Sequence, residues 1–258
     1  MICTLKVFFE MFSIIICSNS PAKFDRISTQ YRQLLKNEPH EIVGVHDARS
    51  LCEGYNRGLA KSRGETVIFS HDDIEIWTPD FSARIRRHLA RFDCIGVTGT
   101  SLLVGANWCE AGPPYIFGQV ATPSDNSYQV GIFGSAKRVM GGIQALDGLF
   151  LAFRRPVIER IGWDEQTFSG FHCYDIDCTY RAYLAGYRLG IAMDLQILHH
   201  SHGNYGEAWK HAARLFHRKH AGTLGRVSPR KFQFAAVNTS SKQEAMAVMS
   251  ELYESLAD

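Results

Sequence analysis

The chain has 258 residues, a length that fits one large α/β domain or one domain with a small appendage. Hydrophobic residues make up 45% and charged residues 21% of the sequence, so a sizeable core can form and wholesale disorder is excluded. The formal net charge of +2 argues against a nucleic-acid-binding protein whose affinity comes from a basic face, although it leaves room for a local pocket that binds an anion.

The N-terminal segment is apolar, but charged residues interrupt it. Lys6 and Glu10 divide the segment, and the uninterrupted run of residues 11–17 is far too short to cross a bilayer. The basic start and the A-x-A-like cleavage site of a signal peptide are not evident. We therefore expect residues 1–11 to form an extension and residues 12–17 (FSIIIC) to form a buried strand.

Strands and helices alternate through the first hundred residues. Solid apolar runs are typical of parallel strands that are covered on both faces, and apolar residues at helical spacing indicate the helices between them. This order predicts an open parallel sheet with right-handed crossovers. The expected strands are 12–17, 41–45, 66–70 and 94–98, and the expected helices are a stretch up to about residue 36, then 50–63 and 80–92.

The second half begins with a segment of different character. Residues 99–143 are rich in Gly, Pro, Ser and aromatic residues without a sustained period, which predicts a functional loop or a small insertion. The sequence contains no P-loop, no dinucleotide-binding glycine motif and no nucleophile elbow. After this segment, the expected strands are 149–153, 188–192 and 196–199, and the expected helices are 176–184, 207–220 and 242–256.

The cysteine content indicates free thiols rather than disulfide bonds. The sequence has seven cysteines, an odd number, at wide spacing and without a C-x-x-C pair. A disulfide framework normally uses an even number of cysteines. We therefore expect reduced thiols in a cytoplasmic protein.

Asp72 and Asp73 are the strongest single feature, because they follow a buried strand directly. Ligands of open α/β sheets bind at the carboxyl ends of the strands. Two carboxylates beside His71 would suit a hard divalent cation such as Mg²⁺ or Mn²⁺, which could clamp a diphosphate. The alternative is structural, because Asp also favours the N-cap and the first turn of a helix.

Asp175 and Asp177 lie where a loop meets an expected helix. A carboxylate in such a position can serve as a general base. Either residue could instead satisfy free backbone N–H groups as an N-cap. The spacing favours a division in which one acid is catalytic and the other is structural.

Three histidines follow the expected strand 196–199. On an extended chain, His200 and His202 point to one side and His199 points to the other. Imidazole nitrogens can complete the ligand shell of Mn²⁺ or Zn²⁺, and the absence of nearby cysteines argues against a structural zinc site. We therefore expect His200 and His202 to act as a pair, without His199, although surface or core histidines remain the alternative.

Taken together, these segments resemble the family 2 glycosyltransferases with the GT-A fold. The resemblance is closest to the bacterial subgroup linked to the synthesis of capsule and surface polysaccharides. The matching stretches come in the family's order and cover most of residues 12–205. They are FSIIICSNS (12–20), HDARSLCEGYNRGLAKSRGETVIFSHDD (46–73), DGLFLAFRR (147–155), IGWDEQTFSGFHCYDIDCTYRAYLAGYRLG (161–190) and HHSHG (199–203).

The resemblance implies an α/β fold of the GT-A type, with a Rossmann-like, mostly parallel sheet flanked by helices and with helices at the C-terminus. It places a glycosyltransferase domain at residues 12–205, after the N-terminal extension. Residues 12–100 would be its nucleotide-binding half and residues 101–205 its acceptor half. Residues 206–258 would form a C-terminal helical appendage.

The resemblance also implies roles for individual residues. The family's D-x-D motif, which holds metal and diphosphate, corresponds to residues 70–73, where Ser70 replaces the usual first Asp. The family's catalytic E-D pair reads Tyr174-Asp175 here, so Asp175 is the implied base. The implied metal ligands are Asp72, Asp73, His200 and His202; the implied nucleotide-sugar contacts are Ser18, Asn19, Asp47, Asn56, Asp72 and Asp147; and the implied acceptor contacts are Trp163, Asp164 and Phe171.

The implied activity is an inverting transfer of a sugar from a nucleotide-diphosphate sugar, in the first instance a UDP-sugar, to a hydroxyl group of a glycan or lipid-linked glycan. Mn²⁺ or Mg²⁺ would be the cofactor. A peripheral membrane contact is compatible with this activity, and no nucleic-acid partner is expected. Two alternatives remain: a catalytically weak or inactive domain that binds a nucleotide sugar, and a nucleotidyltransferase. The second would need a Gly-rich loop with Arg or Lys after the first strand, which residues 18–23 match poorly.

Overall fold

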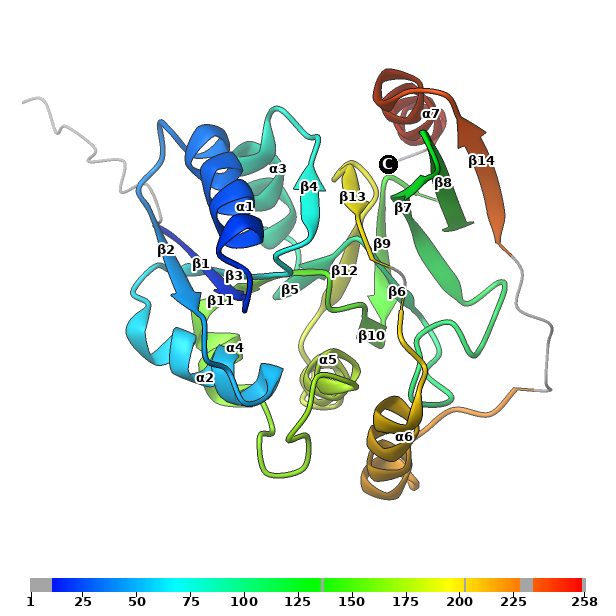
Figure 1. Cartoon of the computed structure of the whole chain (residues 1–258). Helices are drawn as coiled ribbons and strands as arrows, with labels where there is room; N and C mark the ends of the chain where they lie inside the picture. The colour runs from blue at the N-terminus through cyan, green and yellow to red at the C-terminus, as the bar shows by residue number, and fades with distance from the viewer. Residues whose placement is uncertain (1–10, 136, 202, 228–233, 257–258) are drawn as a thin grey trace, which may run out of the picture.

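The computed structural model describes residues 11–135, 137–201, 203–227 and 234–256, so the expected N-terminal extension lies outside it except for Met11. Within these ranges the chain forms two β-sheets with helices around them (Figure 1). The described cysteines are all free, in keeping with their number and spacing. In the same ranges, no helix is both long and apolar enough to cross a membrane.

The first sheet has seven strands in the order β2-β1-β3-β11-β5-β12-β9. Strand β1 pairs in parallel with β2 and β3, and β5 pairs in parallel with β12. Strand β11 lies antiparallel between β3 and β5, and β9 is antiparallel at the edge. The sheet is therefore mixed, with most strands pointing one way. The bounds are Phe12–Cys17 (β1), His40–Val45 (β2), Thr66–Ser70 (β3), Cys94–Gly96 (β5), Val139–Ile143 (β9), Phe150–Arg154 (β11) and Leu189–Ala192 (β12).

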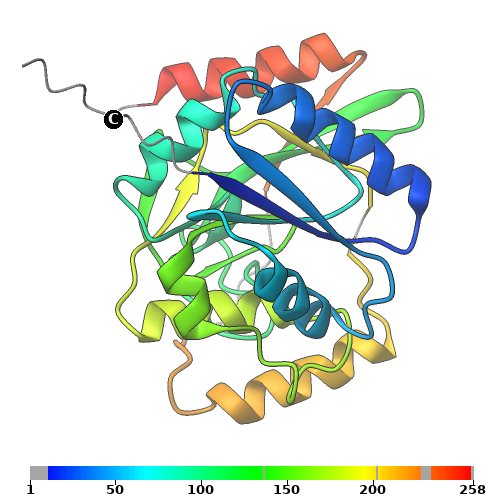
Figure 2. The ribbon, with the colours of Figure 1, turned by 90° about the vertical axis from the view of Figure 1, so that its left-hand side faces the viewer.

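Helices cover both faces of this sheet, as Figure 2 shows. Along β1, Phe12, Ile14 and Ile16 join the core beneath α1 and α3, whereas Ile15 joins the core beneath α2, α4 and α5. This is why the strand reads as a solid apolar run: both of its faces are buried. The helices are Pro21–Leu34 (α1), Leu51–Lys61 (α2), Phe81–Leu89 (α3), Arg155–Ile161 (α4) and Tyr174–Leu184 (α5).

The second sheet corrects the expectation that residues 99–143 form an irregular loop. Its strands run in the order β10-β6-β7-β13-β4, and β8 pairs with β7 in a hairpin. The hairpin turns at Asp125 and Asn126, which both have positive φ, as in a type I′ hairpin turn. The sequence did not predict these strands, because their glycines and half-exposed faces weaken the alternation of apolar and polar residues. The strands are Ile74–Ile76 (β4), Thr98–Thr100 (β6), Ile116–Ser124 (β7), Ser127–Gly134 (β8), Ala145–Leu146 (β10) and Ile197–His199 (β13).

The C-terminal segment holds both expected helices, α6 (Glu207–His220) and α7 (Lys242–Ser255). It also contributes a strand that the sequence analysis missed, β14 (Ala235–Thr239), which pairs with β8. Ala245 and Met249 of α7 pack against the second sheet. Strand β14 and helix α7 are therefore built onto the second sheet, whereas Ala213 and Phe216 of α6 join the core beneath α5.

Asp177 joins α5 to α6. Its fully buried carboxylate lies 2.6 Å from Lys219 Nζ, accepts a 2.8 Å hydrogen bond from Arg181 and lies 2.8 Å from His220 Nε2. Burial alone would raise the pKa of Asp177, but the hydrogen bond with His220 and the charges of Arg181 and Lys219 hold it below the usual value. The expected structural role is thus an ion-pair network rather than an N-cap.

Replacing Asp177 with Ala should lower the free energy of unfolding by roughly 3 kcal/mol, because three basic partners lose a buried counter-charge. Urea unfolding measures this loss. The matched control is Glu207→Ala, which removes a carboxylate from the exposed pair of Glu207 and Lys210 on α6 and should change stability very little. Equal losses in the two variants would contradict the importance of the buried network.

Candidate functional site

The carboxyl ends of β1, β2 and β3 meet at one cavity of about 340 Å³, hereafter the first cavity. Ser18, Asn19 and Asp72 line it, together with His46 and other residues that follow β2. Ser18 Oγ donates a 2.6 Å hydrogen bond to Asp72 Oδ2, which joins the ends of β1 and β3. Ser18, Asn19 and Asp72 therefore converge at one edge of the sheet.

Two other predicted nucleotide contacts lie differently. Asp47 stands at the rim with its side chain 80% exposed and forms a 2.8 Å ion pair with Arg57. The hydrogen bond and the charge of Arg57 lower the pKa of Asp47. Asn56 does not reach the cavity, because its Nδ2 donates to the carbonyl of Trp163 and its Oδ1 accepts from the N–H of the same residue. The assignment of Asn56 as a ligand contact is wrong, since both ends of its amide hold the backbone.

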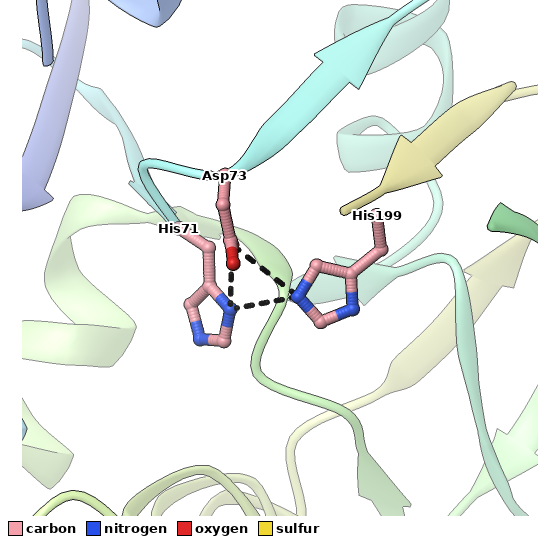
Figure 3. A group of neighbouring side chains, drawn as sticks. All are labelled: His71, Asp73 and His199. Carbon is pink, nitrogen blue, oxygen red and sulfur yellow. Dashed lines mark hydrogen bonds and ion pairs between the residues drawn. The ribbon is translucent and has the colours of Figure 1, made fainter. Parts of the chain in front are cut away.

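His71, Asp73 and His199 form a compact group beside the first cavity (Figure 3). His71 Nδ1 lies 3.4 Å from His199 Nε2 and 3.8 Å from Asp73 Oδ1, and the latter lies 3.4 Å from His199 Nε2. The other nitrogen of His71 lies 2.7 Å from Tyr174 Oη. Three possible ligand atoms therefore face one another, and the contact with Tyr174 orients the imidazole of His71.

This group fits a first-row divalent metal ion. The three distances place a single point about 2 Å from all three atoms, the usual metal–nitrogen or metal–oxygen bond length. Burial and the charge of His199 lower the pKa of His71, so its imidazole is neutral at pH 7. Burial opposes ionisation of Asp73, but above all the hydrogen bond with His199 holds the pKa of Asp73 well below its usual value. One carboxylate with imidazole nitrogens is a donor set that Mn²⁺ accepts.

The structure places the histidines differently from the sequence analysis. His199, which was expected to point away, faces Asp73, whereas the predicted ligand His200 places its Nε2 3.0 Å from Glu75 Oε1. His202 lies outside the described residues. The reason is the antiparallel pairing of β13 with β4, which sets His199 opposite Ile74, the residue after Asp73.

Asp175 lies in a neighbouring cavity of about 220 Å³, the second cavity, which shares His71 with the first. Its Oδ2 accepts a 2.8 Å hydrogen bond from the Gly148 N–H. This approach requires glycine, since a Cβ at position 148 would lie 2.3 Å from Tyr174 Oη. Shielding from water, followed by the charge of Asp147, raises the pKa of Asp175 to about 7. Asp175 can therefore accept a proton near neutral pH.

Asp147 is held by hydrogen bonds next to this acid. Its Oδ2 accepts from Trp108 Nε1 at 2.7 Å, and its Oδ1 accepts from the backbone N–H of Leu149 at 3.0 Å. The sequence analysis did not identify Trp108, Tyr174 or His199 as site residues. Long-range strand and loop placement brings Trp108 and His199 to the acids. Tyr174 adjoins Asp175 in the sequence, at the Glu position of the family's E-D pair.

The predicted acceptor residues divide in the structure. Trp163 is buried within an aromatic cluster and offers no open face to a sugar, so that assignment is wrong. Asp164 is a structural residue, because it pairs with Lys219 Nζ at 2.7 Å and accepts from the backbone N–H of Thr167. Phe171 is 53% exposed and lines both the first and the second cavity. Of the three, only Phe171 lies where an acceptor could touch it.

Comparison with known proteins matches residues 13–220 to a family described as glycosyltransferase-like. A similar solved structure is the mannosyltransferase PcManGT from Pyrobaculum calidifontis in complex with GDP-Man and Mn²⁺, with a TM-score of 0.52 and 14% identity over 85% of this chain and 66% of that one. Another is GalNAc-T7 with UDP, GalNAc and Mn²⁺, with a TM-score of 0.48 and 11% identity over 78% of this chain and 44% of that one. This chain thus spans just under two thirds of the first and less than half of the second. A search of curated proteins found no significant match. The expected GT-A fold is confirmed.

The raised pKa of Asp175 predicts a pH-dependent stability difference. The pKa of an aspartic acid in the unfolded chain is about 4. When folding raises this pKa, the acid destabilises the folded state increasingly as the pH rises above that value. The penalty becomes constant above the folded value of about 7. Asp175→Asn should therefore gain stability relative to wild type between these pH values, as measured by urea unfolding in the presence of EDTA.

Asp164→Asn provides the contrasting control, because Lys219 and Thr167 hold the pKa of Asp164 low despite its partial burial. The loss of stability in Asp164→Asn relative to wild type should have its full size at every pH above about 4, and it should shrink only as the pH falls below that value. A pH-independent difference between Asp175→Asn and wild type would show that Asp175 has an ordinary pKa.

Proposed function

The chain belongs to the glycosyltransferase-like family, and on this premise we propose that it transfers a sugar from a nucleotide-diphosphate sugar, a UDP-sugar in the first instance, to a hydroxyl group of an acceptor. One observation carries the proposal: the first and second cavities share His71, so the possible metal ligands lie between the polar strand ends and Asp175. A donor could therefore lie with its nucleotide in the first cavity and its sugar in the second.

The residues of the first cavity suit the nucleotide part of a donor. Ser18, Asn19 and Asp72 offer hydrogen-bonding groups at the strand ends, and Asp47 at the rim could contact a ribose or base. His71, Asp73 and His199 would hold Mn²⁺ or Mg²⁺, whose positive charge would stabilise the departing diphosphate. The metal in the mannosyltransferase PcManGT is Mn²⁺, which agrees with the two imidazoles found here.

The second cavity suits the chemical step. Asp175, with a pKa of about 7, would take the proton of the acceptor hydroxyl as its oxygen attacks the anomeric carbon and the bond to the diphosphate breaks. Attack from the side opposite the leaving group inverts the configuration of that carbon. The Gly148 N–H positions Asp175. Burial and then the charge of Asp147 raise its pKa. Phe171 could cover the reacting sugar.

The acceptor would be a glycan or a lipid-linked glycan, and the latter would bring the protein to a membrane surface.

The alternative, binding of a nucleotide sugar without turnover, rests on Ser70 in place of the usual first acid. Ser70 is buried, however, and donates to the carbonyl of His71, so it does not line the first cavity. His71 and Asp73 would instead supply the ligand atoms. The nearby Asp175, whose pKa is about 7, would supply the base, which supports turnover over binding alone.

A pair of adjacent histidines tests the metal assignment. His199→Ala should weaken Mn²⁺ binding in the presence of UDP by at least about ten-fold, because a ligand is lost. Electron paramagnetic resonance of free Mn²⁺ measures the affinity. His200→Ala is the matched control and should bind Mn²⁺ like wild type, since His200 pairs with Glu75. Weak binding in His200→Ala together with normal binding in His199→Ala would overturn the assignment.

Asp175→Asn tests the proposed base. The variant should bind UDP and Mn²⁺ normally, yet lose turnover of a UDP-sugar by roughly two to four powers of ten, the usual contribution of a general base. Turnover is measured as release of UDP from a panel of UDP-sugars, first with water as the acceptor. Near-normal UDP release by the variant would exclude Asp175 as the base. No UDP release by the wild-type protein with any UDP-sugar would favour a different donor or the binding-only alternative.

A further inference from the structure

A third cavity of about 610 Å³ opens beside the second and is larger than the two described above. The β7–β8 hairpin forms one wall, through residues that include Gln129 and Phe133. Trp108 and Asp147 line both the third and the second cavity, so the two spaces adjoin next to Asp175. The volume is within the usual range for sites that bind small molecules and leaves room for a ligand the size of a disaccharide.

Aromatic side chains give this cavity flat apolar surfaces. Trp108 packs edge-on against Phe133 with 4.8 Å between ring centroids, and Phe133 lies 5.3 Å from Phe234 at an angle of 32°. Phe234 remains 41% exposed, and Tyr205 at the junction with the second cavity is also exposed. Rings exposed at such a wall can lie against the C–H face of a sugar ring.

Polar side chains interrupt the aromatic surface at several points. The carboxylates of Asp147 and Glu110 and the amides of Asn107 and Gln129 all line the cavity. Trp108 and Leu149 already donate to Asp147, and the Asn107 N–H donates to Glu110. An alkyl chain would replace the remaining hydration of these two carboxylates with no further donor, which is costly. The hydroxyl groups of a sugar would supply such donors. The combination of aromatic and carboxylate groups therefore favours a carbohydrate over a lipid chain.

The charge of the described lining disfavours an acidic sugar or a phosphate. Among the described residues that line this cavity, two are acidic, none is Lys or Arg, and the histidine, His199, already faces Asp73. An anionic group placed here would meet two carboxylates and no cationic side chain from the described wall. Like charges in a partly dry site repel strongly.

We propose that the third cavity binds uncharged sugar rings of the acceptor and thereby limits the acceptor to a neutral glycan. The inference rests on the proposed glycosyl transfer and defines its acceptor class. A ring seated against Phe133 and Phe234 would extend through the shared wall at Trp108 toward Asp175. The hydroxyl group that reacts would belong to the sugar at that junction, and the third cavity would hold the next residue of the glycan.

Saturation-transfer NMR on the full chain tests this proposal with three probes. These are a mixture of neutral disaccharides that covers gluco, galacto, manno and N-acetyl configurations, digalacturonic acid as the acidic counterpart, and 1-octanol as the alkyl probe. Phe234→Ala and Gln129→Ala change the wall of the cavity. Leu184→Ala removes an equally exposed apolar side chain, 47% exposed, that lines none of the three cavities. Binding of UDP with Mn²⁺ is measured on the same samples.

We expect at least one neutral disaccharide to receive saturation from the wild-type protein and from Leu184→Ala. Phe234→Ala should weaken that binding about two- to ten-fold, the value of one aromatic contact. UDP binding should be unchanged in every variant. If the wild-type protein does not bind UDP, the proposed donor site is refuted. The disaccharide signals would still decide whether the third cavity binds a neutral glycan. Binding of only the acidic or the alkyl probe, or of no probe while UDP binds, would overturn the inference.

Discussion

The antiparallel pairing of β4 with β13 is the constraint on which the site depends. Strand β4 begins directly after the turn that carries His71 and Asp73, and β13 ends in His199. Because the two strands are paired, His199 must lie beside Asp73, and His200 must turn toward Glu75. Both strands belong to the second sheet, whereas His71 directly follows β3 of the first sheet. The candidate metal group therefore sits where the two sheets meet, with a cavity on either side.

Two carboxylates in this small region have opposite electrostatic surroundings. Asp73 lies among imidazoles that keep it ionised, whereas Asp175 is shielded from water beside Asp147 and has a pKa of about 7. The first environment suits a group that holds a cation, and the second suits a group that exchanges a proton. Separating the pKa values of neighbouring acids in this way is how one site can combine binding with acid–base chemistry. Shielding from water and the charge of Asp147 raise the pKa of Asp175. The Gly148 backbone only positions this carboxylate, and it comes close enough to do so because glycine has no Cβ.

The features that the sequence predicted are those that local patterns determine. Apolar runs identified β1 and β3, and parallel strands necessarily bring Ser18 and Asp72 to one edge. The side of the chain on which His199 lies could not be predicted, because it depends on pairing between residues more than one hundred positions apart. The β7–β8 hairpin was missed because its glycines and half-exposed faces weaken the alternation, although Asp125-Asn126 was an available turn signal. Trp163 belongs to the core, since an aromatic residue in a loop can turn inward as readily as outward.

We propose that one Mn²⁺ ion is held jointly by imidazole nitrogens of the chain and by the diphosphate of the donor. Electron spin-echo spectroscopy of the protein loaded with Mn²⁺ and UDP measures both kinds of contact in a single sample. The geometry of His71, His199 and Asp73 predicts modulation from two imidazole ¹⁴N nuclei together with coupling to ³¹P. Coupling to ³¹P without any ¹⁴N modulation would contradict the account, because the diphosphate would then carry a metal ion that these histidines do not touch.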